Sequence, residues 1–256
     1  SDAFAYNAYD ASGTFAEGPI TFTLDDPASV TQFGAAASDF VAAADWVDGT
    51  WYGCVYGGTL ITIDMTTGGI TVIGTSPDLS GMAYDWTTNV MYGVDFDGNL
   101  YTIDLATGAG TMIGTGVSGT ITMVCDNTGT LYGWNLNDDS FGSIDKATGA
   151  YTIINPNVGF DFIYAQDASV DHEDNTIYWA AYTTLGALYT IDQATGTPTY
   201  IGDFAGGMEV TGFAIPNPPN TWIGIAPTSG MVNAGGTDQL TVTLDATDII
   251  PGTILE

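Results

Sequence analysis

The chain has 256 residues, 45% hydrophobic and 12% aromatic, and its 30 acidic residues face a single lysine, which gives a formal charge of −29 at pH 7. One lysine cannot neutralise the phosphates of a nucleic acid or an anionic membrane, so both classes of partner are excluded. The apolar content is too high for a disordered acidic tail. The sequence contains no run of about 18 apolar residues, which is the length needed to span a membrane. We therefore expect a folded chain with a sizeable core.

The types of polar residue indicate an all-β fold. Only four of the acidic residues are glutamate, and Asp, Asn, Gly, Thr and Ser take the place of the strong helix formers Glu, Lys, Arg and Gln. The first group favours turns and strands. The scarcity of lysine and arginine favours a secreted protein with few trypsin sites, and halophilic adaptation is the alternative explanation.

In chain order, the first predicted strands cover residues 3–9 and 20–25, and the second of these is a degenerate copy of a repeated motif. The four clearer copies, which share an Ile-Asp pair and a Thr-Gly pair, are Leu60–Gly68, Leu100–Gly108, Phe141–Gly149 and Leu188–Gly196. The repeated aspartates at 25, 64, 104, 145 and 192 are 39, 40, 41 and 47 residues apart. This period matches a four-stranded propeller blade.

The segment 80–116 shows how one blade is predicted to fold. Strands are expected over 81–85, 90–95, 99–104 and 111–114, and Asp97-Gly98 forms the hairpin turn between the second and the third. The copies predict five blades. Because the first copy lacks an inner strand, the strand predicted over 210–215 is expected to pair into blade one and close the ring. Six blades, with one unrecognised, is the alternative.

Beyond the predicted propeller domain, residues 1–215, the proline-rich segment 216–220 predicts a stiff linker. Residues 221–256 contain two strand patterns and the start of a third. With its Trp, Pro-Thr-Ser-Gly, Ala-Gly-Gly and Pro-Gly-Thr in order, this segment resembles the opening of the immunoglobulin-like modules of bacterial surface proteins. That resemblance implies a partial β-sandwich. The chain as a whole resembles secreted β-propeller surface proteins of Bacteroidota, which implies an extracellular or cell-surface location.

An immunoglobulin-like sandwich needs roughly 100 residues, about three times the length of this segment. We expect it to be completed either by further residues of a longer polypeptide or by a strand from a neighbouring molecule. The second case would give head-to-tail homopolymers. The residues predicted to mediate this assembly are Trp222, Ile223, Ile225, Leu240, Val242, Leu244, Ile249 and Ile250.

No catalytic set is predicted. His172 is the only histidine and is interpreted as a solvated turn residue, and Lys146 lies in a turn. Paired carboxylates carry little specificity in a chain so rich in aspartate. Cys54 and Cys125 are expected to be buried free thiols, although a disulfide is possible.

Calcium is the one candidate cofactor. Asp95, Asp97 and Asn99 place oxygen atoms at alternate positions around Gly98, as in the start of a calcium loop. The favoured alternative is that this segment is only a hairpin turn. The Asp of each Ile-Asp pair is expected to cap its strand end, and the in-phase Tyr52, Tyr92, Tyr132 and Tyr178 to pack between blades.

These observations favour a non-catalytic structural subunit of an extracellular filament or surface assembly, which self-associates through its C-terminal segment. A carbohydrate- or surface-binding module of a larger secreted adhesin, with a glycan as possible partner, is the second hypothesis. A carboxylate-dependent hydrolase is the third.

Overall fold

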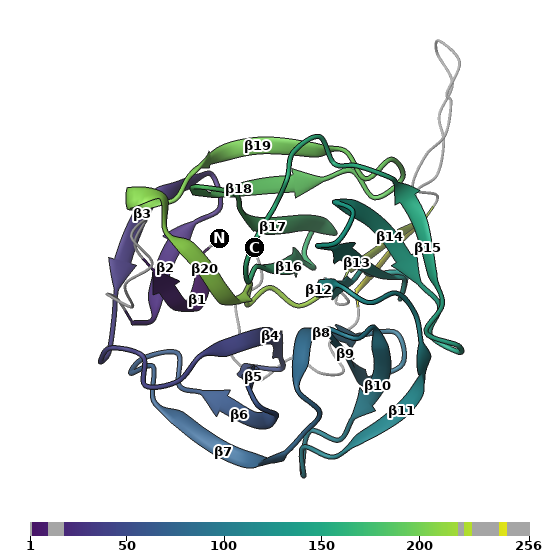
Figure 1. Cartoon of the computed structure of the whole chain (residues 1–256), viewed down its shortest axis with the longest axis horizontal. Helices are drawn as coiled ribbons and strands as arrows, with labels where there is room; N and C mark the ends of the chain where they lie inside the picture. The colour runs from purple at the N-terminus through teal and green to yellow at the C-terminus, as the bar shows by residue number, and fades with distance from the viewer. Residues whose placement is uncertain (1, 10–17, 220–222, 227–240, 245–256) are drawn as a thin grey trace. The chain divides into compact units, whose positions relative to one another are not determined.

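A computed structural model describes residues 2–9, 18–219, 223–226 and 241–244. The chain divides into two compact units, residues 1–218 and 219–256. In the first unit, five antiparallel sheets of four strands form the blades of a ring (Figure 1). The prediction of an all-β, five-bladed propeller is confirmed, and the six-bladed alternative is wrong. Within the described residues, no helix is both long and apolar enough to cross a bilayer.

Each blade is built from strands that are consecutive in the chain, except that blade one takes its inner strand from the end of the propeller. Blade one contains β1 (Asp2–Tyr9), β2 (Ile20–Thr23) and β3 (Asp26–Gln32), with β20 (Glu209–Ala214) as its inner strand. Blade two contains β4 (Val41–Val47), β5 (Thr50–Val55), β6 (Thr59–Ile63) and β7 (Ile70–Thr75). Blade three contains β8 (Leu79–Asp85), β9 (Val90–Asp95), β10 (Asn99–Ile103) and β11 (Gly110–Thr115). Blade four contains β12 (Thr120–Cys125), β13 (Leu131–Asn135), β14 (Ser140–Ile144) and β15 (Tyr151–Asn155). Blade five contains β16 (Asp167–Asp171), β17 (Thr176–Tyr182), β18 (Gly186–Ile191) and β19 (Pro198–Asp203), and the 3-10 turn η1 (Ala205–Gly207) follows it.

The inner strands β20, β4, β8, β12 and β16 surround the centre of the ring (Figure 1). Each contacts the inner strand of the next blade, and β16 contacts β20, so the circle is continuous. Every blade buries its faces against its two neighbours. The largest fully buried side chains include Trp51, Trp134 and Trp179, which lie in the second strands of blades two, four and five.

The ring is closed by β20, which pairs antiparallel with β1 and opposes Phe213 to Ala5. Side chains of blade five also bind the backbone of this strand: the amide of Phe213 donates to Asp167 Oδ2 at 2.9 Å, and the amide of Ile215 donates to Ser169 Oγ at 3.1 Å. The buried Asn7 of β1 accepts a hydrogen bond from the amide of Val41 at 2.7 Å. Blade one is thus tied to both neighbouring blades.

The Ile-Asp-x-x-Thr-Gly motif forms the turn between the third and fourth strands of blades two to five. In blade two, Asp64 Oδ1 accepts hydrogen bonds from the amides of Thr66 and Thr67 at 2.9 and 2.7 Å. Asp104, Asp145 and Asp192 accept the corresponding amides in the other three blades. The glycine that ends the motif has a positive φ, as at Gly68 (68°), which explains the requirement for this residue. The predicted capping role of these aspartates is confirmed.

The in-phase tyrosines pack between blades, as predicted. Tyr92 and Tyr132 are each 8% exposed, and Tyr52 and Tyr178 are partly buried against neighbouring apolar clusters. Cys54 and Cys125 are both buried and free, as expected. The repeat therefore encodes mainly the inter-blade core.

The described part of the second unit is an antiparallel two-stranded sheet, β21 (Ile223–Ala226) and β22 (Thr241–Leu244). Its register opposes Ile223 to Leu244 and Ile225 to Val242, so four of the predicted assembly positions form two cross-strand pairs. The other four, Trp222, Leu240, Ile249 and Ile250, lie outside the described residues. The immunoglobulin-like sandwich remains a prediction.

Candidate functional site

The starts of the inner strands of blades two, three and four surround a pocket of about 170 Å³. Its lining consists of residues at the starts of β4, β8 and β12, together with Tyr56, Phe96 and Ala165. We call the side of the ring on which it lies the start face. The pocket is built largely from equivalent positions of the repeat: blades two and three each contribute the start of the inner strand and the residue after the second strand, and blade four contributes Ile121 at the start of β12.

Three lining residues, Ala42, Ser80 and Ile121, lie at β-bulges. In β4, β8 and β12 the pairing register with the next strand shifts across that residue. A bulge leaves one residue outside the regular pairing and turns its side chain in a new direction. β16 pairs with β17 without such a shift. The bulges therefore mark blades two to four as the part of the ring that forms the pocket.

Aromatic side chains form the walls of this pocket. Tyr56 and Phe96 directly follow the second strands of blades two and three, and their side chains are 72% and 44% exposed. Phe40, just before β4, lies with its ring centroid 6.5 Å from that of Tyr56 in an edge-to-face arrangement. The amide of Tyr56 also donates to the carbonyl of Phe40 at 2.8 Å. In blade four the equivalent residue, Leu136, packs into the core instead.

A long connection closes the side of the pocket nearest blade five. Residues 156–166 join blade four to blade five where residues 116–119 join blade three to blade four, which accounts for the longer spacing in the repeat. This connection is held by Phe162, which is fully buried, and by Phe160, whose ring stacks on Trp179 at 5.6 Å. Its residue Ala165 reaches the pocket.

The pocket has few polar groups. Ser80 Oγ donates to the carbonyls of Val94 and Thr120, so its hydroxyl proton is not free to bind a ligand. Asp78 is exposed and is the charged residue of the lining, and its Oδ1 accepts a hydrogen bond from the amide of Gly57 at 2.8 Å. The amide of Ala165 donates a hydrogen bond to Glu209, and burial nevertheless raises the pKa of Glu209 to about 7. The site therefore suits an apolar group with at most one positive charge.

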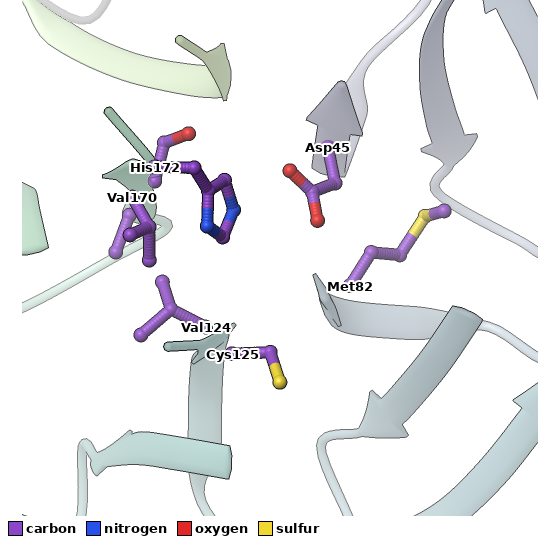
Figure 2. A pocket seen from close by; sticks show the side chains of 8 residues that line it. Asp45, Met82, Val124, Cys125, Val170 and His172 are labelled. Atoms are coloured by element: carbon purple, nitrogen blue, oxygen red, sulfur yellow. The ribbon is translucent and has the colours of Figure 1, made fainter. Parts of the chain in front are cut away.

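A second, narrower pocket lies at the centre of the ring, between β4, β8, β12 and β16. Figure 2 shows the His172 ring and the Asp45 carboxyl group facing one another across it, with Cys125 and Met82 beside them. Burial raises the pKa of Asp45 to about 7, against hydrogen bonds from the amides of Tyr84 and Trp46. The space between these groups has no room for a water-sized molecule. It is a packed core in which a few polar groups lie among apolar side chains.

Comparisons with known proteins bear on the fold. No protein-family model matches the chain, and neither does any curated protein. A protein of unknown function from Bacteroides thetaiotaomicron is similar over 78% of this chain and 64% of its own, with 15% identity and a TM-score of 0.54. This chain thus spans less than two thirds of that protein's length. A chain of a nidogen–laminin complex is similar over 85% of this chain and 100% of its own, with 10% identity and a TM-score of 0.55. At such identities the likeness shows the fold alone.

The interpretation of His172 as a solvated turn residue is wrong. Its side chain is 3% exposed, its Nδ1 lies 2.5 Å from Asn127 Oδ1, and its ring lies edge-to-face on Trp86 at 5.8 Å. Burial lowers the pKa of His172 to about 4, so the ring is neutral at pH 7. Burial also raises the pKa of the Cys125 thiol, which leaves it protonated and a poor nucleophile.

The single lysine neutralises a buried aspartate at the opposite end of β8 from the aromatic pocket. Lys146 Nζ lies 2.7 Å from Oδ2 of Asp85, whose side chain is fully buried at the last residue of β8. Burial alone would raise the pKa of Asp85, but hydrogen bonds from Lys146, Thr87 and Thr88 outweigh it and hold the pKa at about 2. Lys146 therefore joins blade four to blade three.

The calcium candidates lie in the turn between β9 and β10. Asp95 Oδ1 accepts the Asn99 amide at 2.8 Å, and its Oδ2 accepts Asn99 Nδ2 and Tyr101 Oη, each at 2.9 Å. Asn99 Oδ1 accepts the hydroxyl of Thr115 at 2.7 Å. Asp97 is exposed and is not joined to them by these hydrogen bonds. The predicted hairpin turn is present, and a calcium ion would have to displace the donors that hold it.

Proposed function

We propose that the chain is a non-catalytic binding module of a secreted, surface-displayed protein and that the aromatic pocket on the start face is its ligand site. The observation that carries this proposal is that bulges in three successive blades bring Ala42, Ser80 and Ile121 to a single pocket with partly exposed aromatic walls. Concave, mostly apolar sites with few polar groups are typical of ligand sites. The resemblance to Bacteroidota surface propellers supports the extracellular location.

The chemistry of the two pockets favours binding over catalysis. A general acid or base needs to reach a substrate, and His172 and Asp45 face a space with no room for a water-sized molecule. The aromatic pocket is accessible, but Asp78 is its lone carboxylate. Hydrolysis with two carboxylates needs a pair that flanks the reacting bond. The hydrolase hypothesis therefore gains no support at either place.

The proposed function predicts that ligand binding depends on the pocket aromatics. The chain is mixed with neutral oligosaccharides, alkylammonium ions and aliphatic alcohols, and binding is detected by saturation-transfer NMR. At least one class is expected to bind, and a Tyr56→Ala/Phe96→Ala variant is expected to lose most of that signal, because each ring supplies a large part of the contact area. Tyr200→Ala is the matched control, since Tyr200 is 55% exposed on β19 and lies outside the pocket. Signals that persist in the double variant would contradict the proposal.

We also propose, as a second candidate, that the C-terminal unit joins copies of the chain into a filament. The supporting observation is that β21 and β22 form a sheet with no third strand among the described residues. A two-stranded hairpin is marginally stable by itself, and an open edge can accept a strand from another molecule.

The filament hypothesis predicts concentration-dependent assembly of the full chain. Electron microscopy and light scattering are expected to show polymers with a one-subunit repeat, and Ile225→Asp is expected to abolish them, because a charge at a cross-strand pair disfavours sheet addition. Met112→Asp is the control, since Met112 is an exposed apolar residue of β11. A chain that stays monomeric at high concentration, with and without calcium, would eliminate this candidate.

A further inference from the structure

The charge and aromatic content of the pocket on the start face identify the class of its ligand. We propose that it binds a small organic cation, a free quaternary ammonium group without an attached anion, between Phe40, Tyr56 and Phe96 and beside Asp78. This inference rests on the proposed function, because it assigns an occupant to the same site.

The aromatic rings provide the first argument. Three of them line one pocket of about 170 Å³, and two, those of Tyr56 and Phe96, are 72% and 44% exposed. The edge-to-face contact of Phe40 with Tyr56 holds the two rings at 74° to one another, so they present surfaces of different orientation. The faces of aromatic rings carry negative charge density and attract cations, and rings at several angles around one space can surround a compact cation.

Local charge provides the second argument. Two of the three segments that bring an aromatic ring to the pocket also carry an exposed aspartate: Asp39 precedes Phe40, and Asp97 follows Phe96. Asp78 lines the pocket itself. These acids matter more than the total charge of −29, because salt screens charges farther apart than about 8 Å. Lys146 is held by Asp85 at the other end of β8. An anion at the pocket would be repelled, and a cation attracted.

The apolar lining distinguishes a quaternary ammonium group from a lysine ammonium. A lysine ammonium has three N–H donors, and burying them without acceptors is costly. Leu79, Ile121 and Ala165 offer no side-chain acceptors, so the side-chain oxygens of Ser80, Tyr56 and Asp78 would have to accept all three donors. A quaternary ammonium group has no N–H to satisfy, so it can enter such a lining while its charge faces the rings and Asp78. A phosphate-bearing lipid headgroup would bring an anion to the acidic rim.

The test compares choline with its neutral isostere 3,3-dimethylbutan-1-ol, using the intact chain and isothermal titration calorimetry. Choline is expected to bind at least about tenfold more tightly than the alcohol, because the two share a shape and differ in the charge that the rings and Asp78 attract. Phe96→Leu and Asp78→Asn are each expected to weaken choline binding by about threefold to tenfold. Asn keeps the oxygen that accepts the Gly57 amide, so the loop is preserved. Tyr200→Leu is expected to leave the affinity unchanged.

The outcomes separate this inference from the proposed function. Equal binding of choline and the alcohol, lost in Phe96→Leu, would overturn the cation assignment while the pocket remained a ligand site. Pocket-dependent binding of an oligosaccharide but not of choline would do the same. Binding to phosphatidylcholine vesicles without binding to free choline would overturn the assignment to a free cation. If no ligand depended on Tyr56 or Phe96, both the inference and the proposed function would fail.

Discussion

Replacing Phe213 with alanine is expected to lower the free energy of unfolding by about 3–5 kcal/mol and to detach β20 before the other blades unfold. Phe213 is fully buried, its ring centroid lies 5.6 Å from that of Phe22, and its amide donates to Asp167. The loss is a large fraction of the roughly 5–15 kcal/mol that stabilises a typical domain. Urea unfolding and hydrogen exchange of the β1 amides would measure the two effects.

Phe141→Ala is the matched control for ring closure. Phe141 is also fully buried, but it lies in β14 of blade four, whose four strands are continuous in sequence. Both variants are expected to lose a similar amount of stability, because each leaves the cavity of one buried phenylalanine ring. Only Phe213→Ala is expected to expose the amides of β1 in a partly open state. Equal exchange of β1 in both variants would show that closure by β20 is not a weak point of the ring.

Much of the fold follows from the sequence because one pattern serves two purposes. The Asp-x-x-Thr-Gly turns ending at Gly68, Gly108, Gly149 and Gly196 are local structures, and their spacing is also the size of a blade. Local hydrogen bonds and the global repeat therefore point to the same architecture. The closing strand is harder to predict, because its partner β1 lies about 200 residues away and only the missing inner strand of blade one suggests the pairing.

The aromatic pocket was not predicted, although the sequence carries a trace of it. Tyr56 and Phe96 are forty residues apart at the same position of the repeat, where blade four has Leu136. An apolar residue at an exposed hairpin turn departs from the polar turns expected there. The bulges at Ala42, Ser80 and Ile121 leave no such trace, because a bulge depends on how two strands pair.

The environment of His172 could not be predicted for a related reason. Its neighbours in sequence are acidic and typical of a solvated turn, but its partners come from other blades: Asn127 follows β12, and Trp86 follows β8. Short polar segments at the ends of inner strands meet at the centre of a ring, whatever their own composition. Burial there is a property of the closed ring and not of the segment.

The midpoint of thermal unfolding is expected to rise as the pH is lowered from 8 to about 5. Burial raises the pKa of Asp167 to about 8, and that of Asp45 and of Glu209 to about 7. In the unfolded chain these carboxyl groups titrate near pH 4. Between these values the folded chain binds more protons than the unfolded chain, so this stability is present at low pH and is lost as the pH rises. The falling negative charge acts in the same direction.

Other groups set the lower limit of this pH range. The pKa of His172 is lowered to about 4, so the stability that its neutral ring contributes is lost as the pH falls from about 6.5 towards 4. In this pH range His172 therefore acts against the stabilising effect of the three buried acids. The pKa of Asp85 is held at about 2, and hydrogen bonds lower the pKa values of capping aspartates such as Asp64. The stability that these ionised aspartates contribute to the fold is lost when acid protonates them. The midpoint is therefore expected to fall again below about pH 4.

Asp167→Asn is the variant that tests the cause of this pH dependence. Asp167 is fully buried, where it accepts hydrogen bonds from Thr122 Oγ1 and from the amide of Phe213. Asparagine cannot accept at both positions, so the variant is expected to be less stable at pH 5. Its stability should also change less between pH 5 and 8, by up to about 1.4 kcal/mol per pH unit. Asp97→Asn makes the same substitution at an exposed turn and is expected to keep the original slope. A wild-type midpoint that stays constant from pH 5 to 8, or equal slopes in the two variants, would show that buried carboxyl groups do not control the stability of this ring.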